Sequence, residues 1–258
     1  MRLIKKYPRQ YGRLWGIREK FLEPWKRRMV EQNKSLFLGN KDQDRWVIEE
    51  VFHNSKRGRF FLDLAAADGF RANNTLILEK HFGWNGICIE PNPDLYKQLC
   101  KDRACTCLNV CVDEKCRQVE YILNGPISGI VADDTENCLE MRTKLLTRAR
   151  KKKDIVTLET KTLHQILEEN NAPKVIDYFS FDVEGAETRI IRNFPFHLYT
   201  FLALTIERPD AELNKLLFDN GYVFVKNHKV DSFYVHSSIP NINEIHKEPF
   251  SQLPSKSW

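Results

Sequence analysis

One stretch, residues 60–92, limits the possible folds of this chain more than any other. It begins with the apolar run FFLDL and passes through a turn of small residues that ends in Asp68 and Gly69. It closes with a second apolar run, ICI, which stops at Glu90. Between the turn and the second run, apolar residues recur at the spacing of an amphipathic helix. Strand, helix and strand in this order predict a βαβ unit with a right-handed crossover.

The acids of this unit indicate the kind of ligand it binds. Glu90 follows the turn at the distance at which such folds place the acid that binds a ribose. A phosphate-binding turn needs Gly-x-Gly-x-x-Gly, whereas this turn has one glycine, Gly69, and two acids, Asp63 and Asp68. Those carboxylates would repel a pyrophosphate but suit a cation with an ammonium group and ribose hydroxyls, such as S-adenosylmethionine. The alternative is an ordinary βαβ unit with a capped turn.

A second group of acids follows the strand expected at residues 175–183. Side chains alternate across a strand, so Asp182 and Glu184 should share one face. A strand covered on both faces tolerates carboxylates only at its open end, which is the ligand-binding edge of an α/β sheet. Glu207 ends the next expected strand and should reach the same edge. The alternative is that Asp182 and Glu184 cap the following helix.

The whole pattern predicts an α/β protein with a doubly wound sheet that is mostly parallel and carries an antiparallel edge hairpin. Further strands are expected at residues 104–112, 117–123, 155–158 and 201–206, with the hairpin at 222–225 and 232–235. Helices are expected at residues 94–101, 162–170, 185–193 and 211–220. Asp113 follows the strand at 104–112 and is expected near the adenine of the cofactor, unless it belongs only to a strand-end turn.

Three segments, FLDLAAADG, NTLILEKHFGWNGICIEPNP and IDYFSFDVEGAE, resemble in sequence and order the FkbM family of S-adenosylmethionine-dependent methyltransferases. The resemblance extends over roughly residues 42–236. It implies a class I methyltransferase fold, which is Rossmann-like, and O-methylation, commonly of a sugar or a natural-product hydroxyl. The residues expected to bind the cofactor are Asp63, Ala65, Ala67, Asp68, Gly69, Asn74, Glu90, Pro91, Asn92, Asp113 and Asp182.

The turn departs from the family pattern at two positions. The family usually has glycine where this chain has Ala65, and asparagine where it has Ala67. A methyl group at Ala65 would crowd the approach of the cofactor to the backbone, so binding could be weakened or repositioned.

The acids at the second strand end suit the chemistry of methyl transfer to oxygen. An attacking hydroxyl must lose its proton, and Asp182, Glu184 or Glu207 could accept it as a general base. The same three residues are candidate ligands for Mg²⁺, which would acidify the hydroxyl instead. The sequence leaves both schemes open.

Two basic segments lie outside these motifs. Residues 1–41 form an aromatic, basic arm before a domain predicted at 42–238, and residues 239–258 form a polar tail. Residues 1–30 hold ten Lys and Arg against two Asp and Glu. The arm could contact an anionic partner, or it could be a solvated amphipathic helix. Residues 142–153 hold seven Lys and Arg, as in a lid over an anionic acceptor or a solvated loop.

Composition excludes several other classes of protein. No apolar run reaches membrane-spanning length, and the basic start lacks the apolar core of a signal peptide. The seven cysteines show no paired metal-ligand spacing and are expected as free thiols in a reducing, cytoplasmic compartment.

We therefore predict a methyltransferase (EC 2.1.1) whose partner is a carbohydrate or a small molecule with a hydroxyl group. One alternative is a methyltransferase for RNA or protein, which the basic arm suggests. However, the chain has no Asn/Asp-Pro-Pro-aromatic motif, and nothing beyond charge indicates nucleic-acid binding. Another is a non-catalytic interaction protein, supported only by Ala65 and Ala67. The sequence does not indicate an oligomeric state.

Overall fold

The computed structural model describes residues 37–39, 41–53, 58–126, 128–133, 135 and 154–254. The chain divides into two units, Met1–Phe37 and Leu38–Trp258, and every described helix and strand belongs to the second. Apart from residues 37–39 and 41, the predicted arm lies outside the described residues. So does the basic segment 142–153, and both stay predictions.

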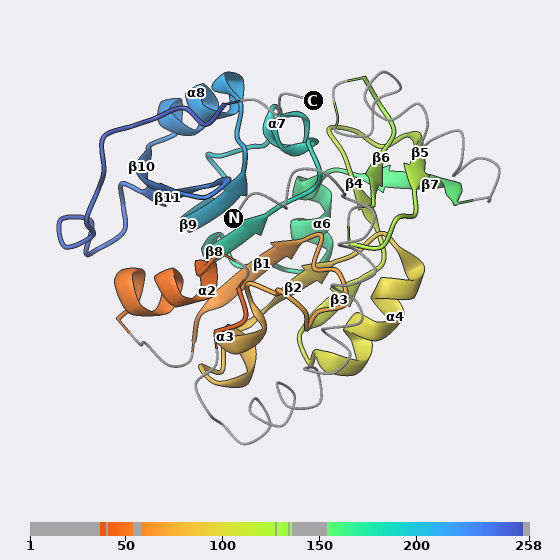
Figure 1. Ribbon diagram of the computed structural model, residues 1–258, viewed down its shortest axis with the longest axis horizontal. Coiled ribbons are helices and arrows are strands. Elements are labelled where there is room, and N and C mark those ends of the chain that lie inside the picture. Colours follow the sequence, from red (N-terminus) through yellow and green to blue (C-terminus); the bar gives the residue numbers. More distant parts are fainter. Residues whose placement is uncertain are drawn as a thin grey trace, which may run out of the picture. The chain divides into compact units, whose positions relative to one another are not determined.

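A seven-stranded sheet forms the centre of the second unit, in the order β10-β11-β9-β8-β1-β2-β3 (Figure 1). Its strands are β1 (Phe60–Leu64), β2 (Asn85–Ile89), β3 (Thr106–Leu108), β8 (Val175–Phe181), β9 (Thr200–Glu207), β10 (Tyr222–His228) and β11 (Asp231–His236). The first five named run parallel to one another, whereas β11 runs antiparallel to both β9 and β10. This confirms the predicted mostly parallel sheet with an antiparallel edge hairpin.

The helices are short and pack on this sheet. They are α2 (Gln43–Arg45), which continues into a π-helical segment at Trp46–Val51, α3 (Leu76–Lys80), α4 (Pro93–Asp102), α6 (Leu163–Glu169), α7 (Glu187–Ile191) and α8 (Ala211–Asp219). Side chains of Asn92, Thr162 and Asp210 cap the N-termini of α4, α6 and α8. These caps satisfy backbone N–H groups that have no partner within the helix. In the described residues, no helix is both apolar enough and long enough to cross a membrane.

Burial in the core explains why the central strands consist mainly of apolar residues. Leu62, Leu64, Phe179 and Phe181 are at most 1% exposed and belong to one cluster that covers the central strands. Strands of a parallel sheet are buried on both faces, so nearly every side chain in β1 and β8 must be apolar. Only the ends of these strands are left for polar chemistry.

A smaller second sheet stands beside the main one, with the order β4-β7-β5-β6 (Figure 1). Its strands are β4 (Cys111–Val112), β5 (Gln118–Ile122), β6 (Gly129–Ile130) and β7 (Ile155–Lys161). The single strand expected at 104–112 is therefore wrong, because it divides into β3 of the main sheet and β4 of the second. Asn109 causes the break: its side-chain amide donates to the carbonyl oxygens of Glu90 (2.7 Å) and Pro91 (3.0 Å). The chain leaves the main sheet at that point.

The C-terminal tail has no helix or strand between residues 239 and 254, as expected, yet it packs on the domain. Ile239 and Ile245 are buried. The Phe250 ring centroid lies 5.2 Å from that of Phe218 and 5.3 Å from that of Phe224. The tail therefore covers apolar surface of α8 and β10.

Candidate cofactor and acceptor site

Four parallel strands, β1, β2, β8 and β9, end at the same edge of the main sheet (Figure 1). The carboxyl edge of an open α/β sheet is where such folds bind ligands. Asp63, Glu90, Asp182 and Glu207 lie at or next to these four strand ends. The observed topology therefore brings these acids to one edge, as the sequence predicts.

The turn after β1 adopts an unusual backbone. Ala65 and Ala67 have φ angles of 62° and 50°, and Gly69 has a φ of 74°. Glycine and asparagine adopt this left-handed region most readily, and these are the residues that the family usually has at the first two positions. A Cβ on Gly69 would lie 2.5 Å from Leu99 Cδ1, so packing against α4 also requires this glycine. The turn therefore has left-handed backbone at Ala65 and Ala67, although alanine adopts that conformation less readily than glycine or asparagine.

Asp63 lies beneath the turn and holds it together. It is 3% exposed and accepts hydrogen bonds from Thr75 Oγ1 (2.7 Å) and Asn73 Nδ2 (3.1 Å). Burial raises the pKa of Asp63, which Arg103 and these hydrogen bonds oppose. The carboxylate thus already has protein partners, and its predicted contact with the cofactor stays a prediction.

Arg103 donates hydrogen bonds to the residues that hold Asp63. Its side chain is fully buried and donates to Glu79 Oε2 (2.6 Å), Asn73 Oδ1 (3.0 Å) and Thr75 Oγ1 (3.0 Å). Arg103 was not predicted, because an arginine after a helix carries no signal that separates it from a solvated one. Only the fold brings it under the turn.

Asp68 has a local role. One of its oxygens accepts hydrogen bonds from the backbone N–H groups of Phe70 (3.1 Å) and Arg71 (2.8 Å), and the other pairs with the Arg71 side chain. With the residue only 4% exposed, these bonds shape the turn.

Glu90 joins the end of β2 to the turn. Its two carboxylate oxygens accept from the backbone N–H groups of Ala67 (2.9 Å) and Asn92 (2.8 Å). Burial raises the pKa of Glu90 to about 7, although both hydrogen bonds lower it. Each oxygen keeps a second lone pair, so the carboxylate can still accept from a ligand hydroxyl. Asn92 also donates through its side-chain amide to Ser128 Oγ (3.2 Å), which ties this corner to the second sheet.

Asn74 leaves an acceptor open at the same edge. Its amide nitrogen donates to Ser180 Oγ of β8 (3.0 Å), while its Oδ1 is buried with no hydrogen-bond partner among the described residues. A buried polar atom without a partner is uncommon and suggests a missing donor. An ammonium group of a bound ligand would supply one.

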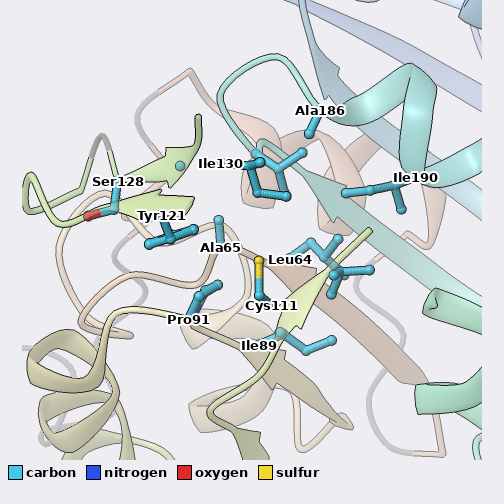
Figure 2. A pocket seen from close by; sticks show the side chains of 13 residues that line it. Leu64, Ala65, Ile89, Pro91, Cys111, Tyr121, Ser128, Ile130, Ala186 and Ile190 are labelled. Carbon is cyan, nitrogen blue, oxygen red and sulfur yellow. The ribbon is translucent and has the colours of Figure 1, made fainter. Parts of the chain in front are cut away.

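A mainly apolar pocket lies beside Glu90: its chain neighbours Ile89 and Pro91 line the pocket, whereas Glu90 is not one of the lining residues. Ala65 and Pro91 line it from the main sheet, Tyr121 and Ile130 from the second sheet, and Ala186 from the start of α7 (Figure 2). A larger pocket shares Pro91 and Cys111 with it. The apolar walls of the first pocket suit the flat faces of an adenine.

Asp113 lines neither of these two cavities. It is fully buried and pairs with Arg117 (2.7 Å) and Arg189 (2.8 Å). These ion pairs link the end of β4 to α7. The expectation that Asp113 follows a strand of the main sheet is wrong, because β4 belongs to the second sheet.

The acids after β8 are arranged differently from the alternating pattern. The strand ends at Phe181, not Val183, and Glu184 has a left-handed φ of 59°. Strand alternation therefore does not place Glu184 on the same face as Asp182. The residue before α7 is Ala186, which provides no side-chain cap, so the capping alternative gains no support.

Asp182 is nevertheless surrounded by carboxylates. Burial raises the pKa of Asp182 well above its usual range, and Glu207, Glu184 and Glu187 raise it further, while Lys41 lowers it. Glu187 is 5% exposed and accepts from the Val183 backbone N–H (2.8 Å), and burial raises its pKa to about 7. Glu187 was not predicted as a site residue, although it stands in the segment IDYFSFDVEGAE.

Glu207 forms ion pairs with two cationic side chains. Lys41 Nζ lies 3.5 Å from it, and the Arg208 guanidinium lies 2.9 Å away. Lys41 also pairs at 2.7 Å with Asp231, which stands opposite Glu207 in the β9–β11 pairing. Lys41 and Asp231 were not predicted, because nothing local to either residue points to the other.

The predicted Mg²⁺ site finds no support. Within the part of the chain that the structure describes, no three His, Cys, Asp or Glu side chains form a group that could hold a metal ion.

The strand order, the acid at the end of β2 and the turn after β1 define a class I methyltransferase fold. Residues 63–224, more than half of the chain, match the model of the methyltransferase FkbM domain, so the protein belongs to the FkbM family of methyltransferases. No match was found among curated proteins.

Similar solved structures share little sequence with this chain. The methyltransferase FkbM from Methylobacillus flagellatus KT has a TM-score of 0.43 and 12% identity, over 86% of this chain and 60% of that one. A TehB-like S-adenosylmethionine-dependent methyltransferase from Corynebacterium glutamicum has 0.39 and 10%, over 84% and 96%. TrmK from M. capricolum, bound to S-adenosylhomocysteine, has 0.40 and 8%, over 83% and 76%. The chain thus spans 60% of the length of the M. flagellatus protein.

Proposed function

We propose that this protein transfers a methyl group from S-adenosylmethionine to a hydroxyl oxygen of a sugar or another small acceptor. The observation that carries the proposal is Asp182, a partly buried acid at the open end of β8 whose pKa burial and neighbouring carboxylates raise. An acid with a raised pKa is a better base for a hydroxyl proton than an ordinary aspartate, provided that it is ionised at the working pH. Family membership supplies the reaction class.

Residues at the carboxyl edge of the sheet suit S-adenosylmethionine, which when bound supplies a methyl group on a positively charged sulfur. Glu90 has free lone pairs for the ribose hydroxyls, and Asn74 Oδ1 is an open acceptor for the ammonium group. Ala65, Pro91 and Tyr121 offer apolar surface to the adenine.

Asp182 would hold the acceptor hydroxyl and take its proton. Holding reactants in line supplies much of the rate in such a displacement. Glu184 and Glu207 would act mainly through their effect on the pKa of Asp182. An anionic acceptor would be repelled by these acids, unless the basic segment 142–153 contacts it. Neutral sugar hydroxyls meet no such repulsion.

The first test measures binding of S-adenosylhomocysteine to the full chain by isothermal titration calorimetry. Glu90→Ala should weaken binding by about 2–3 kcal/mol, the contribution of a charged hydrogen-bonding group. The second test screens labelled S-adenosylmethionine against sugars and glycans, with RNA and protein acceptors in the same panel. Asp182→Asn should then lower kcat by roughly 10²–10⁴-fold with little change in S-adenosylhomocysteine affinity.

The results separate the alternatives. Undetectable binding of S-adenosylhomocysteine would favour a non-catalytic protein that keeps the fold. Binding together with transfer to RNA or protein alone would replace the acceptor class. Near-normal turnover in Asp182→Asn would remove Asp182 as the base and direct attention to Glu184 and Glu207.

A further inference from the structure

Three cysteines meet on one side of the sheet, at β2 and β3. Cys88 Sγ and Cys105 Sγ are 3.6 Å apart, and Cys88 stands opposite Cys107 in the β2–β3 pairing. The Cys107 thiol lies 3.5 Å from the carbonyl oxygen of Cys105. All three are free thiols, and none of them lines the pocket beside Glu90 or the larger cavity next to it.

The two closest thiols are chemically unequal. Cys88 is fully buried, whereas Cys105 is partly exposed. Hydrogen bonding with the Cys107 and Cys88 thiols, together with the charge of Arg103, lowers the pKa of Cys105, and burial raises the pKa of Cys88. The thiolate is the reactive form of cysteine. A partly exposed thiol with a lowered pKa therefore stands next to a buried thiol.

We propose that Cys88 and Cys105 form a site of reversible oxidation, in which a small disulfide such as oxidised glutathione converts the pair to an intramolecular disulfide. Cys105 loses its proton, and its thiolate attacks one sulfur of the oxidant, forming a mixed disulfide and releasing one glutathione thiolate. Cys88 then loses its proton and attacks the Cys105 sulfur, which releases the second glutathione. The protein loses two electrons and two protons, and the oxidant becomes two thiols.

The pair is connected to the cofactor turn. Cys105 is two residues after Arg103, whose guanidinium holds Asn73 and Thr75, and these in turn hold Asp63. An S–S bond needs about 2.05 Å between the sulfurs, compared with 3.6 Å here. We expect closure of this gap to draw the segment before β3 towards β2 and to displace Arg103. Oxidation should thus loosen the turn and weaken S-adenosylhomocysteine binding roughly fivefold or more. This coupling, but not the disulfide, rests on the proposed function.

The test treats the full-length protein with oxidised glutathione, alkylates the remaining thiols and identifies linked peptides by mass spectrometry. We expect a Cys88–Cys105 peptide that dithiothreitol removes. Cys107→Ser should still form it, whereas Cys105→Ser should not. Exposed Cys116 serves as an internal control, because its glutathionylation shows that the oxidant was active.

Two outcomes would overturn the proposal. One is a Cys88 that alkylates fully after denaturation in protein whose Cys116 is already glutathionylated. The other is a link from Cys88 to Cys107 in place of Cys105. If the Cys88–Cys105 link forms but the affinity for S-adenosylhomocysteine is unchanged, the coupling to the turn is wrong. If neither oxidised nor reduced protein binds S-adenosylhomocysteine, the proposed function fails while the disulfide result stands.

Discussion

At the scale of single residues, Glu90 and Ala65 decide how the turn after β1 meets a ligand. Glu90 accepts two backbone hydrogen bonds yet has a pKa raised by burial to about 7. Ala65 lines the pocket with a left-handed backbone. Both residues therefore serve the fold and the site at once, and both can be tested alone.

The first prediction concerns pH. Ribose hydroxyls donate to a carboxylate, so binding favours ionised Glu90. The affinity for S-adenosylhomocysteine should therefore rise as the pH rises towards about 7 and then level off. Calorimetry across this range measures it. Glu90→Gln should bind weakly with little pH dependence. Glu187→Gln is the matched control, because the pKa of Glu187 is also about 7, and it should keep the dependence.

The titration of Glu90 changes the free energy of unfolding in the opposite direction: ligand affinity rises with pH, whereas stability falls. The folded pKa of Glu90 lies above its ordinary value of 4.5, so the folded state binds its proton more tightly than the unfolded state does. The stability that this provides is fully present below about 4.5 and is lost as the pH rises to about 7. Chemical unfolding should show Glu90→Gln gaining stability relative to wild type over that window. An equal difference at every pH would contradict the assignment.

The second prediction concerns the turn backbone. Ala65→Gly should stabilise the protein by about 1 kcal/mol, less the extra freedom that glycine has when unfolded, because an alanine at positive φ is strained. It should also tighten S-adenosylhomocysteine binding, since a methyl group leaves the pocket. Thermal unfolding and calorimetry measure the two effects. Ala66→Gly is the control: Ala66 is buried and has no positive φ, so this change should destabilise.

At the scale of elements, the β1–α3 connection depends on Arg103 at the end of α4. Its guanidinium joins Asn73, Thr75 and Glu79 in a region that water does not reach. The guanidinium donors are spread over three nitrogens in one plane and so reach three separated partners, whereas the three donors of a lysine share a single nitrogen. The turn is thus held by an element beyond it in the chain.

The third prediction follows from this arrangement. Arg103→Met should destabilise the protein by about 3–5 kcal/mol, because it removes the buried cation near Asp63 and leaves the acceptors on Asn73 and Glu79 without their guanidinium donors. Arg103→Lys should recover only part of the loss. Urea unfolding measures both. Arg192→Met is the control: Arg192 is 42% exposed and pairs with Glu212 on the surface, so its loss should cost within about 1 kcal/mol. Equal effects of Arg103→Met and Arg192→Met would show that the hydrogen bonds of Arg103 do not stabilise the β1–α3 connection.

At the scale of the whole molecule, residues outside the region matched by the family model contribute to the acidic edge of the sheet. That region covers residues 63–224, whereas Lys41 precedes it and Asp231 follows it. Asp231 begins β11, which lies between β9 and β10 in the sheet. Gln43 also donates to Asp231 (2.5 Å), so the segment before α2 is fastened to β11 at two points.

The fourth prediction tests the contact between Lys41 and Asp231. Lys41→Met should destabilise the protein by about 1–3 kcal/mol, since buried Asp231 loses a charged partner. Lys41→Arg should restore much of it. In an Asp231→Asn background the cost of Lys41→Met should shrink, because the two residues act together. The exposed pair of Lys215 and Asp219 provides the control Lys215→Met, which should have little effect. Additive costs in the double mutant would show that Lys41 acts elsewhere.

Local patterns in the amino-acid sequence encode one part of this structure. Apolar runs and helical spacing are repeated over a few residues, so the βαβ unit, the edge hairpin and the acids at the strand ends were readable. The departure of Ala65 and Ala67 from the family pattern also marked the turn where the backbone is strained. Tertiary structure alone decided the break at Asn109, the left-handed turn at Glu184, and the pairings of Arg103, Lys41 and the Cys88–Cys105 thiols. Each depends on contacts between residues far apart in the chain or on backbone geometry fixed by packing. Such contacts leave no periodic trace in the residues on either side.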